Sequence, residues 1–349
     1  MNTITVKIDK NNIKKQDLGM ASHIIKSGGV VAFPTETVYG LGADGLNRRA
    51  VEKIFKAKGR PADNPLILHV SSKEQLVPLV EAISDQASAC IERFWPGALT
   101  ILFKRSDLVP DIVTAGLDSV AIRMPDNEIA LKLIEVSETP IAAPSANISG
   151  KPSPTSFNHV KEDMYGKIEM IIDGGSTGIG LESTVLDLSG DTPMILRPGG
   201  ITIEQLREVL PDVVVDPALL DEDTKERPKS PGQKYRHYAP KSEMILFNGD
   251  SKRVVDEINR RKEKYVKEGK RVGIMCTDET RKLYKNAIVI SLGSKYEEVT
   301  IAQNLFFTIR KFDELNVDII LAESVEMSNL GSAIMNRLKK AASGKIIEV

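Results

Sequence analysis

The stretch KGRPADNPLILHV, residues 58–70, decides how the rest of the chain is interpreted. It places the cations Lys58 and Arg60 and a proline-containing polar turn directly before a short apolar segment. Because proline fixes its own φ and restricts the residue before it, Lys58, Arg60 and Asn64 should be held on a constrained loop. Rigid polar groups on such a loop usually serve a ligand. The alternative is a solvated helix C-terminus, where the two cations would oppose the helix dipole.

The composition is that of an ordinary globular protein. The 349 residues exceed one average domain and indicate roughly two. Hydrophobic residues make up 41% and aromatic residues only 5%, so the core should be built mostly from aliphatic side chains. The net charge of −1 gives no global electrostatic reason to bind nucleic acid or an anionic membrane, although a local basic surface stays open.

The cysteines and histidines argue against two kinds of site. Cys90 and Cys276 are too few for a disulfide framework and form no CxxC pair. The four histidines are widely spaced without an HExxH pattern, so we expect no protein-built metal site. The first residues lack a basic region followed by an apolar run, and no apolar stretch approaches the ~20 residues that cross a bilayer. We therefore expect a soluble, cytoplasmic protein without a membrane partner.

Two polar segments on either side of residues 58–70 also follow predicted strands. Val30–Phe33 leads into PTETVYGLG, residues 34–42, where hydroxyls, a carboxylate and glycines indicate a ligand-facing loop. A helix that begins at Thr35 is the alternative. Val120–Arg123 is a strand that ends on an arginine just before Met124-Pro125. Arg123 is either an internal ion-pair partner or an anion clamp, and the sequence alone does not separate the two.

A dense run of small polar residues and prolines occupies residues 144–155, PSANISGKPSPT, after a predicted strand at Ile141–Ala143. Small side chains let backbone N–H groups and hydroxyls approach phosphate oxygens, as a phosphate-binding nest requires. The alternative is a long surface loop.

The remaining elements of the first two hundred residues follow from apolar periodicity. Strands are expected at Thr3–Ile8, Leu66–Val70, Leu99–Phe103, Met170–Asp173, Ser183–Leu188 and Ile195–Arg197. Helices are expected from about Lys15 to Gly28, over the segment with Val51, Ile54 and Phe55 on its apolar face, within Ser72–Phe94, and from a capping box at Thr202 to about Leu210.

The character of the chain changes between residues 211 and 241. Charged residues mix with prolines and the apolar periodicity is lost, which is typical of a linker. Its centre, SPGQKYRHYAP at residues 230–240, is rich in aromatic and cationic groups that bind by stacking and planar hydrogen bonds. We therefore expect this segment to lie over another part of the protein or a ligand.

Strands and helices alternate after the linker, which predicts a small parallel sheet with helices on both faces. It carries neither GxGxxG nor GxxxxGK[ST], so we assign it no nucleotide of its own. The expected strands are Met244–Phe247, Val272–Cys276, Ala287–Ile290 and Ile319–Ala322, and the expected helices are Lys252–Glu268, Glu279–Lys285, Tyr296–Leu315 and Ser332–Ala342.

Together these segments resemble the Sua5/YrdC family. The resemblance rests on blocks that occur in the family's order: PTETVYGLGA (34–43), KGRPADNPLILHV (58–70), FWPGALT (94–100), PSANISGKPSPT (144–155), LESTVLDL (181–188), LRPGGIT (196–202) and SPGQKYRHYAP (230–240). Within them lie the KxR pair, Lys58 and Arg60, and the SxN pair, Ser145 and Asn147. Several blocks in the correct order are more specific than any single short pattern.

The resemblance implies an α/β fold with two domains. A YrdC-like catalytic domain with a mixed, twisted sheet and a deep, electropositive central cavity would span residues 1–210. Residues 211–241 would form a linker and lid. A smaller Rossmann-like parallel-sheet domain, as in the longer Sua5 form, would span residues 242–349.

The resemblance also implies a nucleotidyl transfer in which L-threonine, bicarbonate and ATP give threonylcarbamoyl-AMP and pyrophosphate. The product would pass to transferase proteins that make N6-threonylcarbamoyladenosine (t6A) in tRNA, and direct contact with tRNA stays open. Carried over by position, Lys58 and Arg60 would be catalytic, L-threonine would be held by Thr37, His69, Arg123 and Ser183, and ATP by Arg60, Asn64, Ser145, Asn147, Ser153, Arg197 and Tyr235.

The residue types agree with this chemistry. A carbamate made from the substrate's own amine attacks the α-phosphate, so no protein nucleophile is required. Lysine and arginine suit the charge that develops on pyrophosphate, and an arginine fork suits a carboxylate. Mg²⁺ is expected on the phosphates, held by substrate oxygens and water. Residues 230–240 would close over the site and exclude water from a labile anhydride.

Two other functions compete with this one. An RNA-binding or regulatory protein would use a basic cavity for docking, but the near-neutral charge and the few aromatic residues argue against it. Carbamoyl transfer in hydrogenase maturation uses a related domain, but that role resembles larger proteins with zinc-finger cysteine pairs. Two isolated cysteines do not match them.

Overall fold

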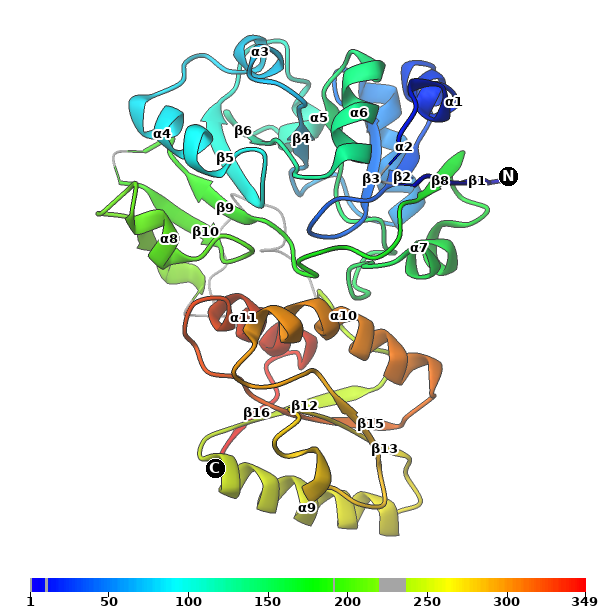
Figure 1. Cartoon of the computed structure of the whole chain (residues 1–349), viewed down its shortest axis with the longest axis vertical. Coiled ribbons are helices and arrows are strands. Elements are labelled where there is room, and N and C mark those ends of the chain that lie inside the picture. Colours follow the sequence, from blue (N-terminus) through cyan, green and yellow to red (C-terminus); the bar gives the residue numbers. More distant parts are fainter. Residues whose placement is uncertain (1, 10–11, 191, 220–236) are drawn as a thin grey trace. The chain divides into compact units, whose positions relative to one another are not determined.

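The structure is a computed structural model that describes residues 2–9, 12–190, 192–219 and 237–349 (Figure 1). The chain divides into two compact units. Unit 1 comprises Met1–Ser149, Ser153–Gly178 and Glu182–Tyr235, and unit 2 comprises Gly150–Pro152, Ile179–Leu181 and Arg236–Val349.

Unit 1 is built on an 11-stranded mixed sheet of order β1-β8-β2-β3-β7-β4-β6-β5-β9-β10-β11. Its strands are β1 (Ile4–Lys7), β2 (Val31–Phe33), β3 (Gly40–Asp44), β4 (Ile67–His69), β5 (Leu99–Lys104), β6 (Ser119–Arg123), β7 (Ile141–Ala142), β8 (Met170–Asp173), β9 (Thr184–Asp187), β10 (Met194–Arg197) and β11 (Val214–Val215). Most are short aliphatic runs that are buried on both faces, as parallel and mixed sheets covered by helices require.

Both faces of this sheet are covered by apolar clusters. Val31 and Phe33 of β2 pack in one cluster with helices α1 and α6, whereas Ala32 packs in the other with α2 and α4, because successive side chains of a strand point to opposite faces. The helices of unit 1 are α1 (Lys15–Lys26), α2 (Arg48–Lys58), α3 (Lys73–Leu76), α4 (Asp85–Phe94), α5 (Asp111–Thr114), α6 (Glu128–Ser137), α7 (Phe157–Met164) and α8 (Ile203–Arg207), with 3₁₀ turns η1 (Val77–Leu79) and η2 (Pro217–Leu219).

Helix α2 delivers the polar loop that follows it. The Asn47 side chain accepts hydrogen bonds from Arg49 N at 3.1 Å and Ala50 N at 3.3 Å, which fixes the start of the helix. Gly59, with φ of 61°, ends it in the left-handed conformation that glycine adopts without steric cost. Lys58 is the last helical residue, but its side chain is buried, so the alternative of a solvated helix end is wrong for this lysine.

The predicted strands of unit 1 are confirmed within one or two residues, and β1 is an edge strand as expected. The capping box at Thr202 is also confirmed. The sheet continues into the span predicted as a linker, because β11 pairs in parallel with β10. Most of that span, residues 220–236, lies outside the described residues.

Unit 2 is the expected small parallel sheet, of order β14-β13-β15-β12-β16. Helix α9 covers one face and α10 and α11 cover the other (Figure 1). Its elements are β12 (Glu243–Asn248), α9 (Ser251–Lys267), β13 (Val272–Cys276), η3 (Arg281–Leu283), β14 (Ile288–Ser291), α10 (Glu298–Glu314), β15 (Ile319–Glu323), α11 (Gly331–Ala341) and β16 (Ile346–Glu348).

Two details of unit 2 differ from the sequence-based prediction. The helix expected over Glu279–Lys285 is only the 3₁₀ turn η3, because so short a segment forms few helical hydrogen bonds to offset the cost of nucleation. Strand β16 was not predicted, and it pairs with β12 at the sheet edge. The four remaining strands and three helices are confirmed.

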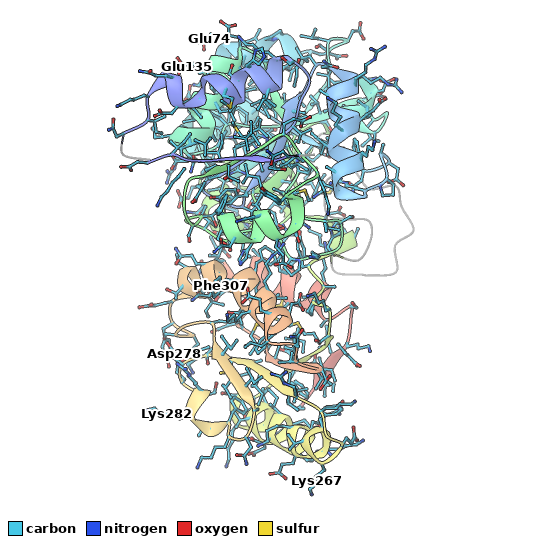
Figure 2. All side chains as sticks on the ribbon, turned by 90° about the vertical axis from the view of Figure 1, so that its right-hand side faces the viewer. Glu74, Glu135, Lys267, Asp278, Lys282 and Phe307 are labelled. Atoms are coloured by element: carbon cyan, nitrogen blue, oxygen red, sulfur yellow. The ribbon has the colours of Figure 1, made fainter. Side chains whose placement is uncertain are left out.

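Charged side chains cover the outer surfaces of both units. Glu74, Glu135 and Lys267, for example, are exposed and point away from the core of the unit that carries them (Figure 2). Among the helices that the structure describes, none is long and apolar enough to cross a membrane.

Candidate active site

Strand pairing brings the predicted threonine-binding residues to one place in unit 1. Strands β4 and β6 are parallel and pair His69 with Arg123, so both side chains stand at the carboxyl ends of neighbouring strands. Strand β5 lies next to β6, and β9 next to β5, which places Ser183 at the same end because Thr184 N donates to Ala98 O at 3.0 Å. The loop between β2 and β3 supplies Thr37. We call these four residues and Glu36 the arginine cluster.

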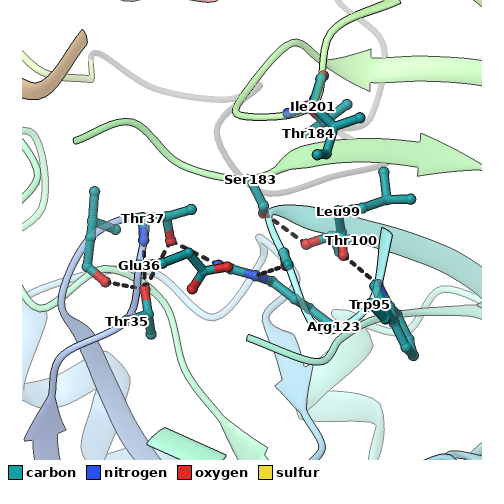
Figure 3. A network of polar contacts seen from close by, with 12 residues as sticks. Thr35, Glu36, Thr37, Trp95, Leu99, Thr100, Arg123, Ser183, Thr184 and Ile201 are labelled. Atoms are coloured by element: carbon teal, nitrogen blue, oxygen red, sulfur yellow. Dashed lines mark hydrogen bonds and ion pairs between the residues drawn. The ribbon is translucent and has the colours of Figure 1, made fainter. Parts of the chain in front are cut away.

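Arg123 is the centre of the arginine cluster (Figure 3). Its side chain is buried, and its Nε donates to Gly97 O at 3.0 Å. Its Nη1 donates to Thr37 Oγ1 at 2.9 Å, and its Nη2 lies 2.6 Å from Glu36 Oε1. One of the two alternatives left open by the sequence is therefore realised: Arg123 has an internal ion-pair partner.

The loop between β2 and β3 is shaped by its own hydroxyls. Thr35 Oγ1 donates to Val38 O at 2.7 Å, accepts from Thr37 N at 3.2 Å, and shares a hydrogen bond of 2.9 Å with Thr37 Oγ1. These bonds fold the segment into a turn that aims Thr37 and Glu36 at Arg123 (Figure 3). The alternative of a helix beginning at Thr35 is wrong.

His69 is a buried, neutral imidazole. Burial, reinforced by the positive charge of Arg123, lowers the pKa of His69 to about 3. Its Nδ1 is buried and has no hydrogen-bond partner among the described residues. A neutral imidazole with one unused nitrogen is suited to a hydroxyl group rather than to an anion.

Ser183 is held by side chains from two strands, β5 and β10. Its Oγ lies 2.7 Å from Thr100 Oγ1 on β5. Arg197, at the end of β10, donates from Nη2 to Ser183 O at 2.8 Å and to Ser183 Oγ at 3.1 Å. Gly199 lies so close to this turn that a Cβ there would stand 2.3 Å from the Ser183 carbonyl carbon. Arg197, predicted for ATP, is therefore in direct contact with Ser183, predicted for threonine.

A second group forms where α2 meets the loop after β7, and we call it the lysine cluster. Lys58 Nζ donates to Ser145 O at 2.5 Å and to Asn147 O at 2.7 Å, and Ser149 N donates to Lys58 O at 3.0 Å. Ser145 Oγ donates to Asn147 Oδ1 at 2.5 Å. The KxR lysine and the SxN pair are thus brought together. Residues 152–155 of the same loop are buried, so the alternative of a plain surface loop is wrong.

Arg60 and Asn64 form the polar turn that the prolines constrain. Arg60 Nη2 donates to Asn64 O at 2.9 Å and to Pro65 O at 3.1 Å, which closes the turn. The Asn64 side chain is fully buried, and neither Oδ1 nor Nδ2 has a hydrogen-bond partner among the described residues. A buried amide without partners is costly unless a ligand satisfies it, so Asn64 has the properties of a binding residue.

Two predicted ATP residues remain. Ser153 is buried and donates from Oγ to Glu182 Oε1 at 2.5 Å, directly beside Ser183 in sequence. Tyr235 lies outside the described residues. Of the predicted lid segment, Tyr238 is described: it is buried in unit 2, with its ring centroid 5.1 Å from that of Phe306.

The two clusters are joined by the segment that contains Thr37. Tyr39 O accepts from Ala146 N at 2.8 Å, and Gly40 bridges to Ser145. Strand β4, which separates the clusters, has only 3 residues, so it is about 10 Å long. Among the described residues no three His, Cys, Asp or Glu side chains could jointly hold a metal ion.

Comparison with known proteins agrees with this geometry. The Sua5/YciO/YrdC family model, described as "Telomere recombination", matches residues 23–199, and the model for the C-terminal domain of threonylcarbamoyl-AMP synthase matches residues 201–343. A threonylcarbamoyl-AMP synthase of Pyrococcus abyssi is 51% identical over 99% of this chain and 100% of its own length. The chain belongs to the Sua5/YrdC family. The fold predicted from the family resemblance, a mixed sheet followed by a smaller parallel-sheet domain, is confirmed.

Further relatives match over nearly the whole chain. A threonylcarbamoyl-AMP synthase of Bacillus subtilis is 47% identical, covering 97% of this chain and 96% of the relative. The crystal structure of P. abyssi Sua5 complexed with L-threonine has a TM-score of 0.93 at 50% identity, with both chains covered completely. This Sua5-type chain therefore shares both units with proteins of that name.

Glu36 is the member of the arginine cluster that the sequence analysis did not assign. The carboxylate was noted in the loop at residues 34–42, but its ion-pair partner Arg123 belongs to a distant strand. The sequence could have indicated the Glu36–Arg123 pair only if the loop at residues 34–42 and the strand that ends at Arg123 had been considered together. Thr35 and Thr100 were likewise missed, because each acts through a neighbouring hydroxyl.

Proposed function

We propose that this chain is a threonylcarbamoyl-AMP synthase, a nucleotidyltransferase that condenses L-threonine, bicarbonate and ATP to threonylcarbamoyl-AMP and pyrophosphate. The observation that carries the proposal is the arginine cluster: a buried guanidinium, a neutral imidazole and two hydroxyl groups converge from separate elements. A small zwitterion with a hydroxyl group matches this set of partners. The full-length likeness to a Sua5 structure that contains L-threonine supports the same assignment.

In this proposal the arginine cluster binds the amino acid. Arg123 takes the carboxylate, because its guanidinium is the buried cation of the cluster. His69 Nδ1 has no such partner either and meets the threonine hydroxyl, while Thr37 and Ser183 close the pocket around the substrate. Holding the amine in a fixed position raises its effective concentration toward bicarbonate or CO2.

The lysine cluster and the polar turn bind ATP. Asn64 offers an unsatisfied buried amide, and Arg60 offers the planar fork that suits phosphate oxygens. Lys58 holds the loop of Ser145 and Asn147 through two carbonyls, so it both positions this loop and brings a positive charge next to it. Ser153 and Arg197 approach from the Ser183 side, and Tyr235 completes the predicted ATP set.

The chemical step needs positioning and charge neutralisation more than a protein nucleophile. The neutral amine of threonine forms a C–N bond with the carbon of CO2 or bicarbonate and becomes a carbamate. With CO2 the amine loses one proton to water, and with bicarbonate the C–O bond to its hydroxyl breaks and water leaves. A carbamate oxygen then bonds to the α-phosphorus while the bond to the β-phosphate bridging oxygen breaks, and pyrophosphate leaves. Lys58, Arg60 and Arg197 would balance the charge that develops on pyrophosphate.

Mg²⁺ would enter with the triphosphate. Since the described residues contain no cluster of three metal-ligating side chains, the ion would be held by phosphate oxygens and water. Its contribution would be to neutralise the phosphates. The protein residues would hold the triphosphate in line with the carbamate.

The product defines the proposed partners. Threonylcarbamoyl-AMP would pass to transferase proteins that modify tRNA to t6A, and the chain would act with them in the cytoplasm. Direct contact with tRNA is not required for the reaction. Residues 230–236 of the predicted lid lie outside the described residues. Deleting residues 228–236, which keeps Tyr238 in unit 2, should reduce synthesis if the segment serves the site.

The decisive experiment measures pyrophosphate release by the purified chain. Release should require ATP, L-threonine and bicarbonate together, and mass spectrometry should identify threonylcarbamoyl-AMP. Pyrophosphate release that continues without threonine would contradict the proposal. Tight, salt-dependent RNA binding without ATP consumption would instead favour an RNA-binding protein.

A further inference from the structure

Glu36 combines two features that an internal ion pair does not need. Its Oε1 lies 2.6 Å from Arg123 Nη2, with 12% of the Glu36 side chain and 4% of the Arg123 side chain exposed. Its Oε2 is buried and accepts no hydrogen bond from any described residue. Arg123 Nη2 is engaged by Oε1 in this ion pair. The pair thus leaves one buried acceptor, Glu36 Oε2, without a donor beside a buried guanidinium.

Such a pair costs free energy in the absence of a ligand. Both charged groups lose hydration on burial, and the carboxylate oxygen Oε2 gains no donor in return. The hydrogen bonds of Thr35 with Val38 O and Thr37 N fix the turn that contains Glu36. The backbone of the loop therefore presents Glu36 to Arg123. Groups that stay unsatisfied in a rigid setting indicate a ligand with the complementary groups.

The complementary ligand is a zwitterion. An amino acid carries a carboxylate and an ammonium group on the same carbon atom, and the cluster offers the Arg123 guanidinium next to Glu36 Oε2, an acceptor without a donor among the described residues. The carboxylate would pair with the guanidinium, and the ammonium group would donate to the carboxylate oxygen. Both bonds would be charge-assisted and therefore among the stronger hydrogen bonds in proteins.

We propose that Glu36 binds the α-ammonium group of the amino-acid substrate and selects amino acids over acids that lack the amine. This inference deepens the proposed function and rests on it, because it assumes that the arginine cluster is the threonine site. The opposite role is a carboxylate that occupies Arg123 in place of the substrate, and it predicts the opposite effect of removing the charge.

The test compares two ligands by calorimetry on the full chain. L-Threonine is compared with (R)-3-hydroxybutanoate, the same molecule without its amino group. The wild-type chain should bind threonine at least about 10-fold more tightly. In Glu36→Gln, the affinity for threonine should fall by about 10- to 100-fold, whereas that for 3-hydroxybutanoate should stay the same or rise. The preference for the amine should therefore disappear.

The matched control is Asp126→Asn. Asp126 is exposed and lies near Glu36. Burial, and then the charge of Glu36, raise the pKa of Asp126. The Asp126→Asn variant should keep the wild-type preference for threonine over 3-hydroxybutanoate, because it removes a nearby charge that does not belong to the arginine cluster. Circular dichroism verifies that each variant is folded, and the wild-type comparison of the two ligands tests the inference even if Glu36→Gln does not fold.

The outcomes are distinguishable. Tighter binding of threonine by Glu36→Gln would mean that Glu36 competes for Arg123 and would overturn the inference. Equal losses for both ligands would reduce Glu36 to a structural residue and would also overturn it, as would a wild-type chain that binds both ligands equally. A wild-type chain that binds no threonine, with or without ATP, would instead refute the proposed function itself.

Discussion

The two units each contain a buried carboxylate near a strand end, and the two carboxylates differ in the hydrogen bonds that they accept. Glu323 ends β15 in unit 2 and accepts hydrogen bonds from Thr277 N at 3.0 Å, Thr280 Oγ1 at 2.9 Å and Tyr284 OH at 2.5 Å. Burial and the Glu323 charge raise the pKa of Tyr284, so its hydroxyl stays protonated and donates. In unit 1, Glu36 Oε1 is paired with Arg123 at 2.6 Å, and Oε2 accepts no hydrogen bond from any described residue.

This difference distinguishes a carboxylate that stabilises the fold from one that is available to a ligand. A carboxylate whose oxygens are satisfied by its own unit fixes that unit, and removing it leaves donors unpaired. A carboxylate with a buried oxygen that accepts no hydrogen bond, beside a buried arginine, is better explained by a ligand. Asn64 and His69 share the second condition, and both belong to unit 1. The predictions below test this contrast.

Arg60→Ala should produce the largest effect. Loss of the planar fork that is proposed to meet the phosphates should reduce pyrophosphate release by about 100-fold or more, because one preorganised charge-stabilising group typically contributes that much. Arg60→Lys keeps the charge without the fork and should recover only part of the rate. The assay is threonine-dependent pyrophosphate release, with Arg260→Ala on the exposed surface of α9 as the control.

Near-normal turnover by Arg60→Ala would mean that Arg60 does not bind ATP. It would also weaken the contrast between a ligand-binding unit 1 and a unit 2 whose buried carboxylate serves the fold. The same holds for Arg197→Ala, although Arg197 also holds Ser183 and its loss should affect threonine binding too. Thermal unfolding of each variant distinguishes a lost charge from a lost fold.

Much of the fold could be predicted from the sequence because short aliphatic runs need burial whatever their neighbours are. The strand Val120–Arg123 and the helix that ends at Lys58 are examples of this. Strands β3, β11 and β16 were missed. Gly40–Gly42, the start of β3, was assigned to the ligand-facing loop because of its glycines. Val214–Val215 and Ile346–Glu348 are too short or too polar to stand out and depend on β10 and β12 for pairing. Tertiary context decides such cases.

The residues of the candidate site could be predicted by position, but not their contacts. That His69 stands beside Arg123 depends on the register of β4 and β6, and no local pattern encodes a register between distant strands. The pairing of Glu36 with Arg123 has the same origin. Lys58 was predicted to face the phosphates, and its contacts with Ser145 O and Asn147 O depend on a loop that only folding brings near.

Glu323→Gln should destabilise the fold without affecting the proposed site. An amide cannot accept all three hydrogen bonds with the strength of a carboxylate, so the free energy of unfolding should fall by about 2 kcal/mol. Urea unfolding followed by circular dichroism measures the loss, and Glu314→Gln on the exposed surface of α10 serves as control. Threonine binding should remain at the wild-type value. A loss of threonine binding at unchanged stability would contradict the structural role of Glu323.

His69 should make stability depend on pH. Its folded-state pKa of about 3 lies below the ordinary 6.5, so between these values the unfolded chain binds more protons than the folded one. Stability from this residue is therefore full above pH 6.5 and declines as the pH falls toward 3, by up to about 1.4 kcal/mol per pH unit. Urea unfolding of the wild-type chain and His69→Gln at several pH values between 5 and 7.5 isolates this component. Parallel profiles for the two proteins would show that His69 is not neutral and buried.

Asn64→Leu should have the smallest effect on stability. It should also separate stability from ATP binding most clearly. The Asn64 amide is fully buried and makes no side-chain hydrogen bond to a described residue, so leucine of similar size removes an unsatisfied polar group. The free energy of unfolding should therefore change by no more than about 0.5 kcal/mol, or rise. ATP binding, measured by calorimetry, should weaken about 10-fold, because the ligand loses the hydrogen bonds that the amide is proposed to supply. A strongly destabilised variant with unchanged ATP affinity would mean that Asn64 serves the fold, and that unsatisfied buried groups in unit 1 do not identify the ligand site.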